Sequence, residues 1–148
     1  MQYVLQTPLQ KSDLAPLRAG DTVLLSGVVY TARDAAHARM MELLDAGKEL
    51  PFPIEGAAIY YVGPTPERPG CAIGAAGPTT SGRMDAYTPR LLDLGLACMI
   101  GKGKRNQAVK DSVVKNGAVY LAAIGGAGAL MARSVESCEI IAWPDLGC

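Results

Sequence analysis

The sequence has few aromatic side chains, no excess of charge of either sign and no long apolar run. One Phe and one Trp occur among 148 residues, so we expect a core built from Ala, Leu, Val, Ile and Met. Lys plus Arg and Asp plus Glu number 14 each, which argues against a nucleic-acid-binding protein that relies on a broad basic surface. No stretch approaches the ~20 apolar residues that a membrane-spanning helix requires. We therefore expect neither a nucleic-acid nor a membrane partner.

The cysteines also lack the patterns of metal and disulfide sites. Cys71, Cys98, Cys138 and Cys148 include no CxxC pair and do not have the spacing of a metal site. A chain of this length needs no disulfide framework. The first six residues lack the charged start and apolar block of a secretory signal. The sequence therefore predicts a cytoplasmic protein with reduced thiols and no metal bound to this chain.

The length and the apolar pattern predict one α/β layered domain over residues 1–148. A β-rich first half is followed by a β-α-β-α-β unit with parallel strands. Thr31 and Asp34 have the spacing of a capping box that opens a helix running to about residue 46. Thr88 and Pro89 begin a helix that Gly95 ends. Strands are predicted over residues 3–5, 22–30, 57–62, 71–76, 96–100, 118–124 and 138–143, and two further helices over 106–115 and 127–135.

The stretch 77–85 (Gly-Pro-Thr-Thr-Ser-Gly-Arg-Met-Asp) has no apolar periodicity, so core packing does not explain it. Thr79, Thr80 and Ser81 are residue types that cap a helix N-terminus, and the glycine after them allows a ligand to approach the backbone. Together with the guanidinium of Arg83, these groups would form a receptor for a carboxylate or a phosphate. The alternative is an ordinary helix cap with Arg83 in solvent.

Two further cations occupy positions that suit an anion. Arg33 falls in the first turn of the helix that the capping box predicts, where the helix dipole makes a cation unfavourable by up to ~1 kcal/mol. Arg83 has the same position after its own cap. Two such arginines indicate an anion between them, although both could instead extend into solvent. Lys102 lies between two glycines directly after a buried strand, at the end of the strand where α/β sheets place ligands.

The remaining glycines and cations near Lys102 do not form a nucleotide-binding motif. The loop lacks the spacer and the Lys-Ser/Thr pair of a Walker loop, and residues 125–128 lack the third glycine of a dinucleotide fingerprint. Lys104 and Arg105 are predicted to be solvated charges.

His37 is the only histidine, and helical spacing places it on the same face as Met40, Met41 and Leu44. It could be a satisfied, half-buried histidine. It also lies one helical turn from Arg33, close enough to serve the same pocket as a proton-transfer or orienting group. The cations and hydroxyls together predict a receptor for a small molecule with more than one negative charge. Because no electrophile or strong paired base is evident, we expect this chain to complete a site on a partner.

Three of these segments resemble a known family. Residues 31–37 (Thr-Ala-Arg-Asp-Ala-Ala-His), 77–85 and 100–103 (Ile-Gly-Lys-Gly) resemble the β subunit, or C-terminal domain, of class I iron–sulfur fumarate hydratases. The wider family includes L-tartrate dehydratase. The resemblance extends over nearly the whole chain, from Thr7-Pro8 to residues 143–147, and the second motif is long and specific.

The resemblance implies a swivelling β/β/α-type domain that docks onto an α subunit, which makes the enzyme a hetero-oligomer. The α subunit would carry a [4Fe–4S] cluster held by three cysteines and would supply the other acid/base residue. The reaction implied is the reversible hydration of fumarate to L-malate, with the cluster iron as Lewis acid. Arg33, Arg83 and Lys102 would hold the carboxylates of this small dicarboxylate substrate, and Thr80 would be a further substrate contact.

The resemblance also implies roles for Thr79 and His37 and a preference between substrates. Thr79 would be the hydroxyl at the reacting carbon, and His37 matches a position sometimes assigned as active. The tartrate branch carries Cys-Arg-Asp and Ser-Met-Arg-Met-Glu where this chain has residues 32–34 (Ala-Arg-Asp) and 81–85 (Ser-Gly-Arg-Met-Asp), which favours fumarate. The family's β chains generally continue into further strand, so we expect this chain to lack that C-terminal extension. The alternatives are an L-tartrate dehydratase β subunit and a stand-alone dicarboxylate-binding domain without catalysis.

Overall fold

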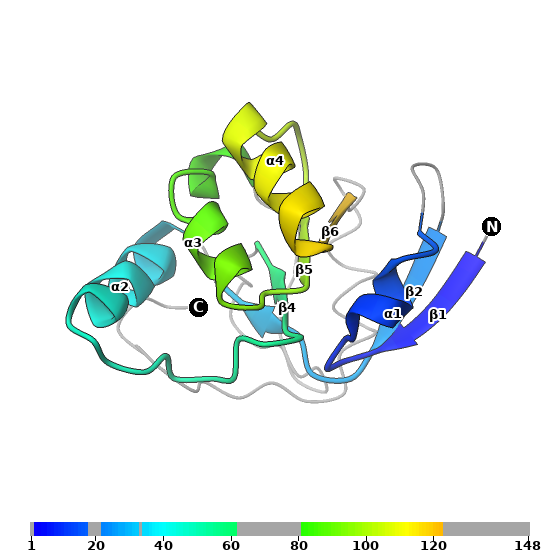
Figure 1. Cartoon of the computed structure of the whole chain (residues 1–148), viewed down its shortest axis with the longest axis horizontal. Coiled ribbons are helices and arrows are strands. Elements are labelled where there is room, and N and C mark those ends of the chain that lie inside the picture. Colours follow the sequence, from blue (N-terminus) through cyan, green and yellow to red (C-terminus); the bar gives the residue numbers. More distant parts are fainter. Residues whose placement is uncertain (1, 18–21, 33, 62–80, 123–148) are drawn as a thin grey trace, which may run out of the picture.

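The computed structural model describes residues 2–17, 22–32, 34–61 and 81–122, and these residues form an α/β fold with parallel sheets (Figure 1). This confirms the predicted α/β class. The elements in chain order are β1 (Gln2–Gln6), α1 (Lys11–Leu14), β2 (Thr22–Ser26), β3 (Tyr30–Thr31), α2 (Asp34–Asp45), β4 (Ala58–Tyr60), the 3₁₀ helix η1 (Ser81–Met84), α3 (Thr88–Asp93), β5 (Cys98–Gly101), α4 (Gln107–Asn116) and β6 (Val119–Ala122).

The larger sheet has the strand order β3-β4-β5-β6, and each neighbouring pair is parallel. Because all four strands run in the same direction, their carboxyl ends all lie at one edge of the sheet. The predicted unit of strand, helix and strand over 96–124 is confirmed by β5, α4 and β6. The predicted strands over 71–76 and 138–143 and the helix over 127–135 lie outside the described residues.

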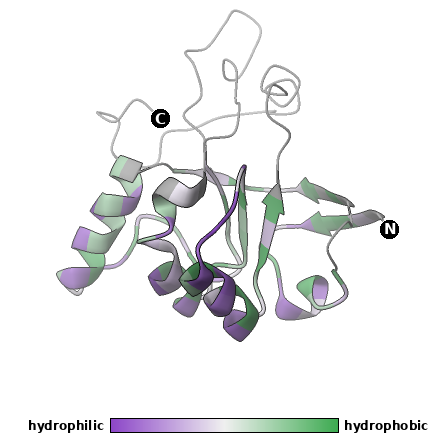
Figure 2. Cartoon of the chain, turned by 90° about the horizontal axis from the view of Figure 1, so that it is seen from above, coloured by the Kyte–Doolittle hydropathy of each residue, from purple (hydrophilic) through white to green (hydrophobic). Residues whose placement is uncertain are grey.

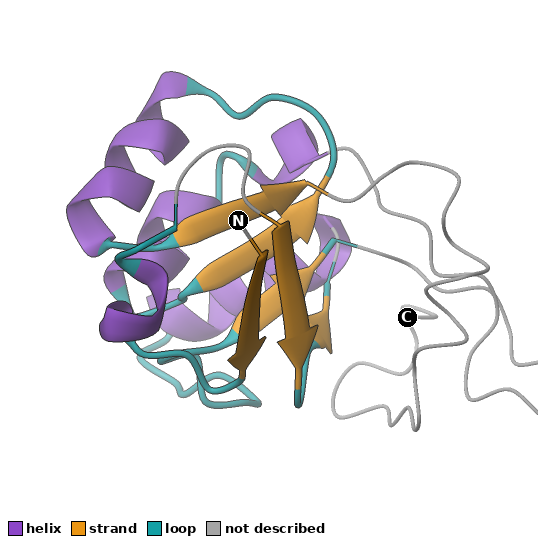
Figure 3. Ribbon diagram, turned by 90° about the vertical axis from the view of Figure 1, so that its right-hand side faces the viewer, coloured by secondary structure: helices purple, strands orange, loops and turns teal. Residues whose placement is uncertain are grey.

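Each face of the larger sheet is covered by its own apolar cluster. Ile59 and Met99 belong to a cluster with residues of α2 and α3, whereas their neighbours Ala58 and Cys98 belong to a second cluster with Leu9 and partly buried residues of β1 and β2. This assignment follows the alternation of side chains along a strand. Figure 2 shows hydrophilic and hydrophobic residues mixed along the helices, as expected for helices with one face against the sheet. Strands β1 and β2 form a separate parallel pair that runs across the direction of the other four strands (Figure 3).

The predicted single strand over 22–30 is wrong, because the chain divides there between the two sheets. Gly27 has φ = 100°, a conformation that side chains rarely adopt, and a Cβ there would collide with Thr7 Oγ1. The amide of Thr7 donates to the carbonyl of Ser26 (2.9 Å), and its hydroxyl donates to the carbonyl of Val28 (2.8 Å). This bend ends β2 and redirects the chain into β3.

The capping box predicted from Thr31 and Asp34 is also wrong. Thr31 lies in β3, opposite Tyr60 of β4, and α2 begins at Asp34. The backbone of Thr31 therefore belongs to the strand ladder, which suits its β-branched side chain. Arg33, between Ala32 and the first residue of α2, lies outside the described residues. The short helix α1 was not predicted from the sequence.

The later helices agree with their sequence signals. α3 has Pro89 in its first turn, as predicted. Asn106 caps α4 by accepting a hydrogen bond from the amide of Val109 (2.9 Å), and Gly117 ends it with φ = 64°. No helix among the described residues has the length and apolar character needed to cross a membrane.

The thiol of Cys98 predicts how stability depends on pH. Cys98 is completely buried in β5, and burial raises its pKa from 9.0 to about 12. Between these values the unfolded chain has lost the thiol proton and the folded chain keeps it. The free energy of unfolding should therefore fall as pH rises from about 9 towards 12, by up to ~1.4 kcal/mol per pH unit from this group.

Urea unfolding of the wild type and of Cys98→Ala at a series of pH values measures this contribution. The variant should lose stability less steeply above pH ~9. Parallel pH profiles for the two proteins would show that Cys98 does not titrate with a raised pKa.

Candidate functional site

The candidate site lies at the carboxyl edge of the larger sheet, where open α/β sheets commonly bind ligands. The ladder continues past the strand ends, since the amide of Ala32 donates to the carbonyl of Tyr60 (3.2 Å) and the amide of Tyr61 donates to the carbonyl of Ile100 (2.8 Å). Ala32 is the residue before Arg33, and Ile100 lies two residues before Lys102. The strands that lead to these two cations therefore end at the same edge, on either side of β4.

The structure describes the predicted site residues unevenly. Lys102 is exposed and follows β5 directly, and it forms a β-bridge where a loop was predicted. Arg33, Thr79 and Thr80 lie outside the described residues. Of Arg83 the backbone is described, and it belongs to η1, a single turn of four residues.

The helix dipole expected at Arg83 is not found. The α-helix expected after the Thr-Thr-Ser sequence is one 3₁₀ turn, which aligns few peptide dipoles. The corresponding prediction for Arg33 falls on a residue outside the described ranges. The case for an anion at this edge therefore depends on how the segments converge.

The backbone brings two of the predicted segments together. An ideal Cβ built on Gly82 of η1 would lie 3.6 Å from the carbonyl oxygen of Lys104, which is ordinary van der Waals contact. η1 also contacts α2. Gly82 therefore lies close to Lys104, the residue directly after the Gly-Lys-Gly loop (Gly101, which ends β5, Lys102 and Gly103), although many residues separate them in the sequence.

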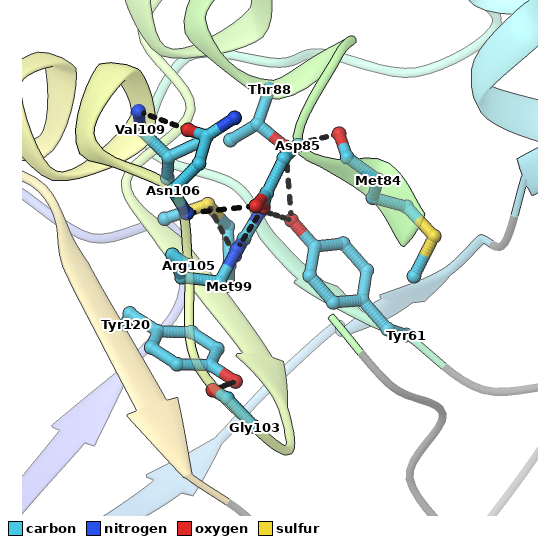
Figure 4. A network of polar contacts seen from close by, with 10 residues as sticks. All are labelled: Tyr61, Met84, Asp85, Thr88, Met99, Gly103, Arg105, Asn106, Val109 and Tyr120. Carbon is cyan, nitrogen blue, oxygen red and sulfur yellow. Dashed lines mark hydrogen bonds and ion pairs between the residues drawn. The ribbon is translucent and has the colours of Figure 1, made fainter. Parts of the chain in front are cut away.

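A buried polar network lies behind this contact (Figure 4). Its centre is Arg105, which is 6% exposed. Arg105 Nε donates to Asp85 Oδ1 at 2.5 Å, and Nη2 donates to Thr88 Oγ1 at 2.9 Å and to the hydroxyl of Tyr61 at 3.2 Å. The prediction that Arg105 is a solvated charge is wrong, because the connection from β5 to α4 places its guanidinium among these acceptors.

The carboxylate of Asp85 joins two segments of the chain. While Oδ1 accepts from Arg105, Oδ2 accepts from the amide of Asn106 (2.8 Å). Thr88 donates to the carbonyl of Met84 (2.8 Å), which connects the start of α3 to η1. The last residue of the stretch 77–85 is therefore held to the N-terminal end of α4 by an ion pair and a backbone hydrogen bond.

Two tyrosine rings enclose the guanidinium of Arg105. Its Cζ lies 5.1 Å from the ring centroid of Tyr61 and 5.0 Å from that of Tyr120, within the range of cation–π attraction. The hydroxyl of Tyr120 donates to the carbonyl of Gly103 (2.9 Å), in the Gly-Lys-Gly loop. Burial raises the pKa of Tyr61, and the positive charge of Arg105 partly opposes this, so the phenol keeps its proton at neutral pH.

His37 is packed into the interior beside this network. Its side chain is completely buried, and its ring centroid lies 5.5 Å from that of Tyr61 and 5.9 Å from that of Tyr87. The sequence left two readings open, a half-buried histidine without a chemical role and a proton-transfer or orienting group. The ring contacts fit the first reading, although the burial is more complete than predicted. A role for His37 in proton transfer stays a prediction.

The described residues do not gather metal-ligating side chains at one place. Among residues 2–17, 22–32, 34–61 and 81–122, no group of three or more His, Cys, Asp or Glu side chains could hold a metal ion. Within these ranges, Cys98 is a buried thiol with a raised pKa, which disfavours the thiolate that binds iron.

Two hollows among the described residues differ in their position relative to the predicted site. A hollow of about 530 Å³ is lined by Gly56, Gly95 and Gly117, which precede β4, β5 and β6 and so lie at the opposite, amino edge of the sheet. A second hollow of about 400 Å³ is lined by Gly103, which follows Lys102, and by Arg105 and Tyr120.

Comparison with known proteins gives consistent matches. A family model described as Fumarase C-terminus matches residues 1–148. The chain is 46% identical over 125 residues to the anaerobic class I fumarate hydratase of Escherichia coli K12. The matched residues cover 83% of this chain and 23% of that protein. It is 38% identical over 147 residues to fumarate hydratase 2 of Leishmania major, covering 97% and 26%.

A shorter relative matches over most of its own length. The chain is 31% identical over 150 residues to L(+)-tartrate dehydratase subunit beta of Escherichia coli K12, covering 99% of this chain and 73% of that subunit. The chain therefore spans about a quarter of the length of the fumarate hydratases and nearly three quarters of this subunit.

The burial of Arg105 predicts a large effect on stability. Arg105→Ala should lower the free energy of unfolding by about 3–5 kcal/mol, because the carboxylate of Asp85 would remain buried without its cation. Arg90→Ala is the matched control. It removes an ion pair with Asp45 (2.7 Å) whose side chains are 44% and 71% exposed, so it should cost at most ~1 kcal/mol. Urea unfolding measures both, and equal losses would contradict a special role for the buried pair.

Proposed function

Because this chain belongs to the Fumarase C-terminus family, we propose that it is the substrate-binding part of an iron–sulfur hydro-lyase that reversibly hydrates fumarate to L-malate. The observation that carries the proposal is the match of the family model to all 148 residues. The closeness of Gly82 in η1 to the carbonyl of Lys104, two residues after Lys102, supports it, because it brings two segments of the predicted anion receptor near each other. The apolar clusters on both faces of the larger sheet are also what a swivelling β/β/α layered domain would require.

In this proposal the chain neutralises and orients a substrate with two negative charges. Arg33, Arg83 and Lys102 bind the two carboxylates. Arginine forks suit planar carboxylates, and lysine adds a point charge. Thr80 is a further substrate contact at the same edge. Fixing both ends of the substrate holds its double bond in one orientation, which lowers the entropic part of the barrier to hydration.

The proposed proton chemistry uses Thr79 and His37. The hydroxyl of Thr79 lies at the reacting carbon and assists the proton transfer that accompanies the addition of water. His37 orients this region from the interior, through its contacts with Tyr61 and Tyr87.

The proposed cofactor is a [4Fe–4S] cluster carried by an α subunit, or by a corresponding domain, with which this chain forms a hetero-oligomer. When bound there, the cluster supplies an iron that acts as Lewis acid on the substrate. Two observations support a partner. The chain spans 23% of the E. coli fumarate hydratase, and its match to the tartrate enzyme is to a protein named as subunit beta.

L-tartrate dehydratase is a second candidate function. It is favoured by the coverage of 73% of the E. coli subunit beta, whereas the higher identity to the fumarate hydratase favours fumarate. The substrate carboxylates would bind in the same way in either case. An assay of both substrates with one preparation of the complex therefore decides between them.

The proposal predicts that Lys102 and Thr79 matter for hydration by the anaerobically reconstituted complex with a cluster-bearing partner. Thr79→Ala should lower kcat by roughly 10²–10⁴-fold, and Thr79→Ser, which keeps the hydroxyl, should retain more activity. Lys102→Ala should lower kcat/KM by roughly 10–100-fold through a lost ion pair with a carboxylate. Lys104→Ala is the matched control, because Lys104 is also exposed and lies two residues further along the chain.

Steady-state kinetics with fumarate, malate and tartrate measure these effects. Equal losses in the Lys102 and Lys104 variants would contradict the assigned role of Lys102. If the complex is inactive on every substrate while this chain alone binds dicarboxylates, the stand-alone binding domain replaces the proposed enzyme.

A further inference from the structure

We propose that the ion pair between Asp85 and Arg105 is a positioning device that sets the spacing between η1 and the Gly-Lys-Gly loop, and so makes the site selective for dicarboxylates over monocarboxylates. Neither residue would touch the substrate. This inference rests on the proposed function for the identity of the ligand, whereas the geometry of the pair is independent of it.

The pair is close in sequence to the two cationic positions that it would align. Asp85 lies two residues after Arg83, and its amide donates to the carbonyl of Gly82 in η1 (3.3 Å). Arg105 lies three residues after Lys102. The bond from Arg105 to Asp85 (2.5 Å) therefore connects the two backbone segments over a short path, and the bond from the Asn106 amide to Asp85 (2.8 Å) is a second connection beside it.

The surroundings of Arg105 fix the direction of its guanidinium. Besides Asp85 it donates to Thr88 and Tyr61, and Nη1 also lies 3.6 Å from the sulfur of Met99. The rings of Tyr61 and Tyr120 lie close to the Cζ atom of Arg105. A guanidinium has a planar array of donors that can satisfy several acceptors at once, whereas a lysine ammonium is a compact charge without this fork.

Stability alone does not account for a pair of this kind. A buried ion pair loses much of its Coulombic gain to desolvation, and apolar residues of similar volume often stabilise a fold as well or better. The interior already contains an apolar cluster on each face of the sheet. A pair that is buried, directional and placed between two candidate ligand-binding segments is better explained by the geometry it imposes.

This geometry has a specific consequence for ligand choice. A dicarboxylate needs two cationic groups at a fixed separation, so a small change in the spacing of the segments weakens its binding. A monocarboxylate needs one group, and the same change has little effect on it. The preference for a dicarboxylate over a monocarboxylate therefore reports on positioning, while a general loss of stability would leave the preference unchanged.

The test compares Asp85→Asn, Arg105→Lys and the double variant, each as the full chain reconstituted with its cluster-bearing partner. Succinate and propionate are the probes, as inhibitors of hydration. The preference for succinate is the ratio of the inhibition constants of propionate and succinate. This ratio should fall at least tenfold in each single variant. It should fall no further in the double variant, because both changes act through one pair. The exposed pair supplies the controls Asp45→Asn and Arg90→Lys, which should keep the wild-type preference.

A second measurement uses this chain alone and does not depend on activity. Amide hydrogen exchange should accelerate together in residues 84–88 and 101–107 of Arg105→Lys, by at least tenfold, while residues 37–44 of α2 keep their wild-type rates. Tyr61→Phe, which keeps the ring and removes one hydrogen bond, should show a smaller change in the same two segments. It also provides a milder variant if either substitution in the pair prevents folding.

The outcomes separate this inference from the proposed function. Unchanged succinate preference in the folded single variants overturns the inference, as does unchanged exchange in both segments. A wild-type complex that hydrates none of the substrates overturns the proposed function, and the exchange experiment still decides whether the pair positions the two segments.

Discussion

The buried ion pair between Asp85 and Arg105 is the interaction through which the separate parts of the carboxyl edge are joined. It connects η1 to the end of the loop that follows β5, and its hydrogen-bond partners extend to α3 through Thr88 and to β4 through Tyr61. The ring of Tyr120 on β6 lies against the same guanidinium. Elements that are distant in the sequence therefore share one charged group. A guanidinium that is buried away from water needs hydrogen-bond acceptors from the protein. The position of these elements at the carboxyl edge therefore follows from supplying acceptors to Arg105.

The parallel sheet supplies the setting for this network. Strands in the order β3-β4-β5-β6 place successive connections at one edge, and the two apolar clusters cover the faces on either side. Family membership and geometry are consistent here, because two of the segments that resemble fumarate hydratases, 31–37 and 100–103, include the ends of β3 and β5. The hollow of about 530 Å³ lies at the amino edge instead.

Local signals in the sequence predicted the elements that local chemistry determines. Pro89 marked the start of α3, and the helix predicted over 106–115 corresponds to α4 within one residue at each end. The predictions failed where a distant contact decides the outcome. Thr7 imposes the bend at Gly27, and pairing with β4 takes Thr31 into a strand. Arg105 was missed because apolar periodicity says nothing about a buried cation. The available signal was its position directly before a helix cap, in a chain that offers Asp85 as a counter-ion.

The coverage of both sheet faces has a consequence for how this fold can change during evolution. Ala58 and Ile59 pack into opposite clusters, so a substitution in a central strand disturbs one layer or the other. Among the described residues, the carboxyl edge is joined to this double-sided scaffold through the polar cluster around Arg105. Sequence variation can therefore accumulate at the rim, altering what is recognised there, while the interior stays nearly the same from one descendant to the next.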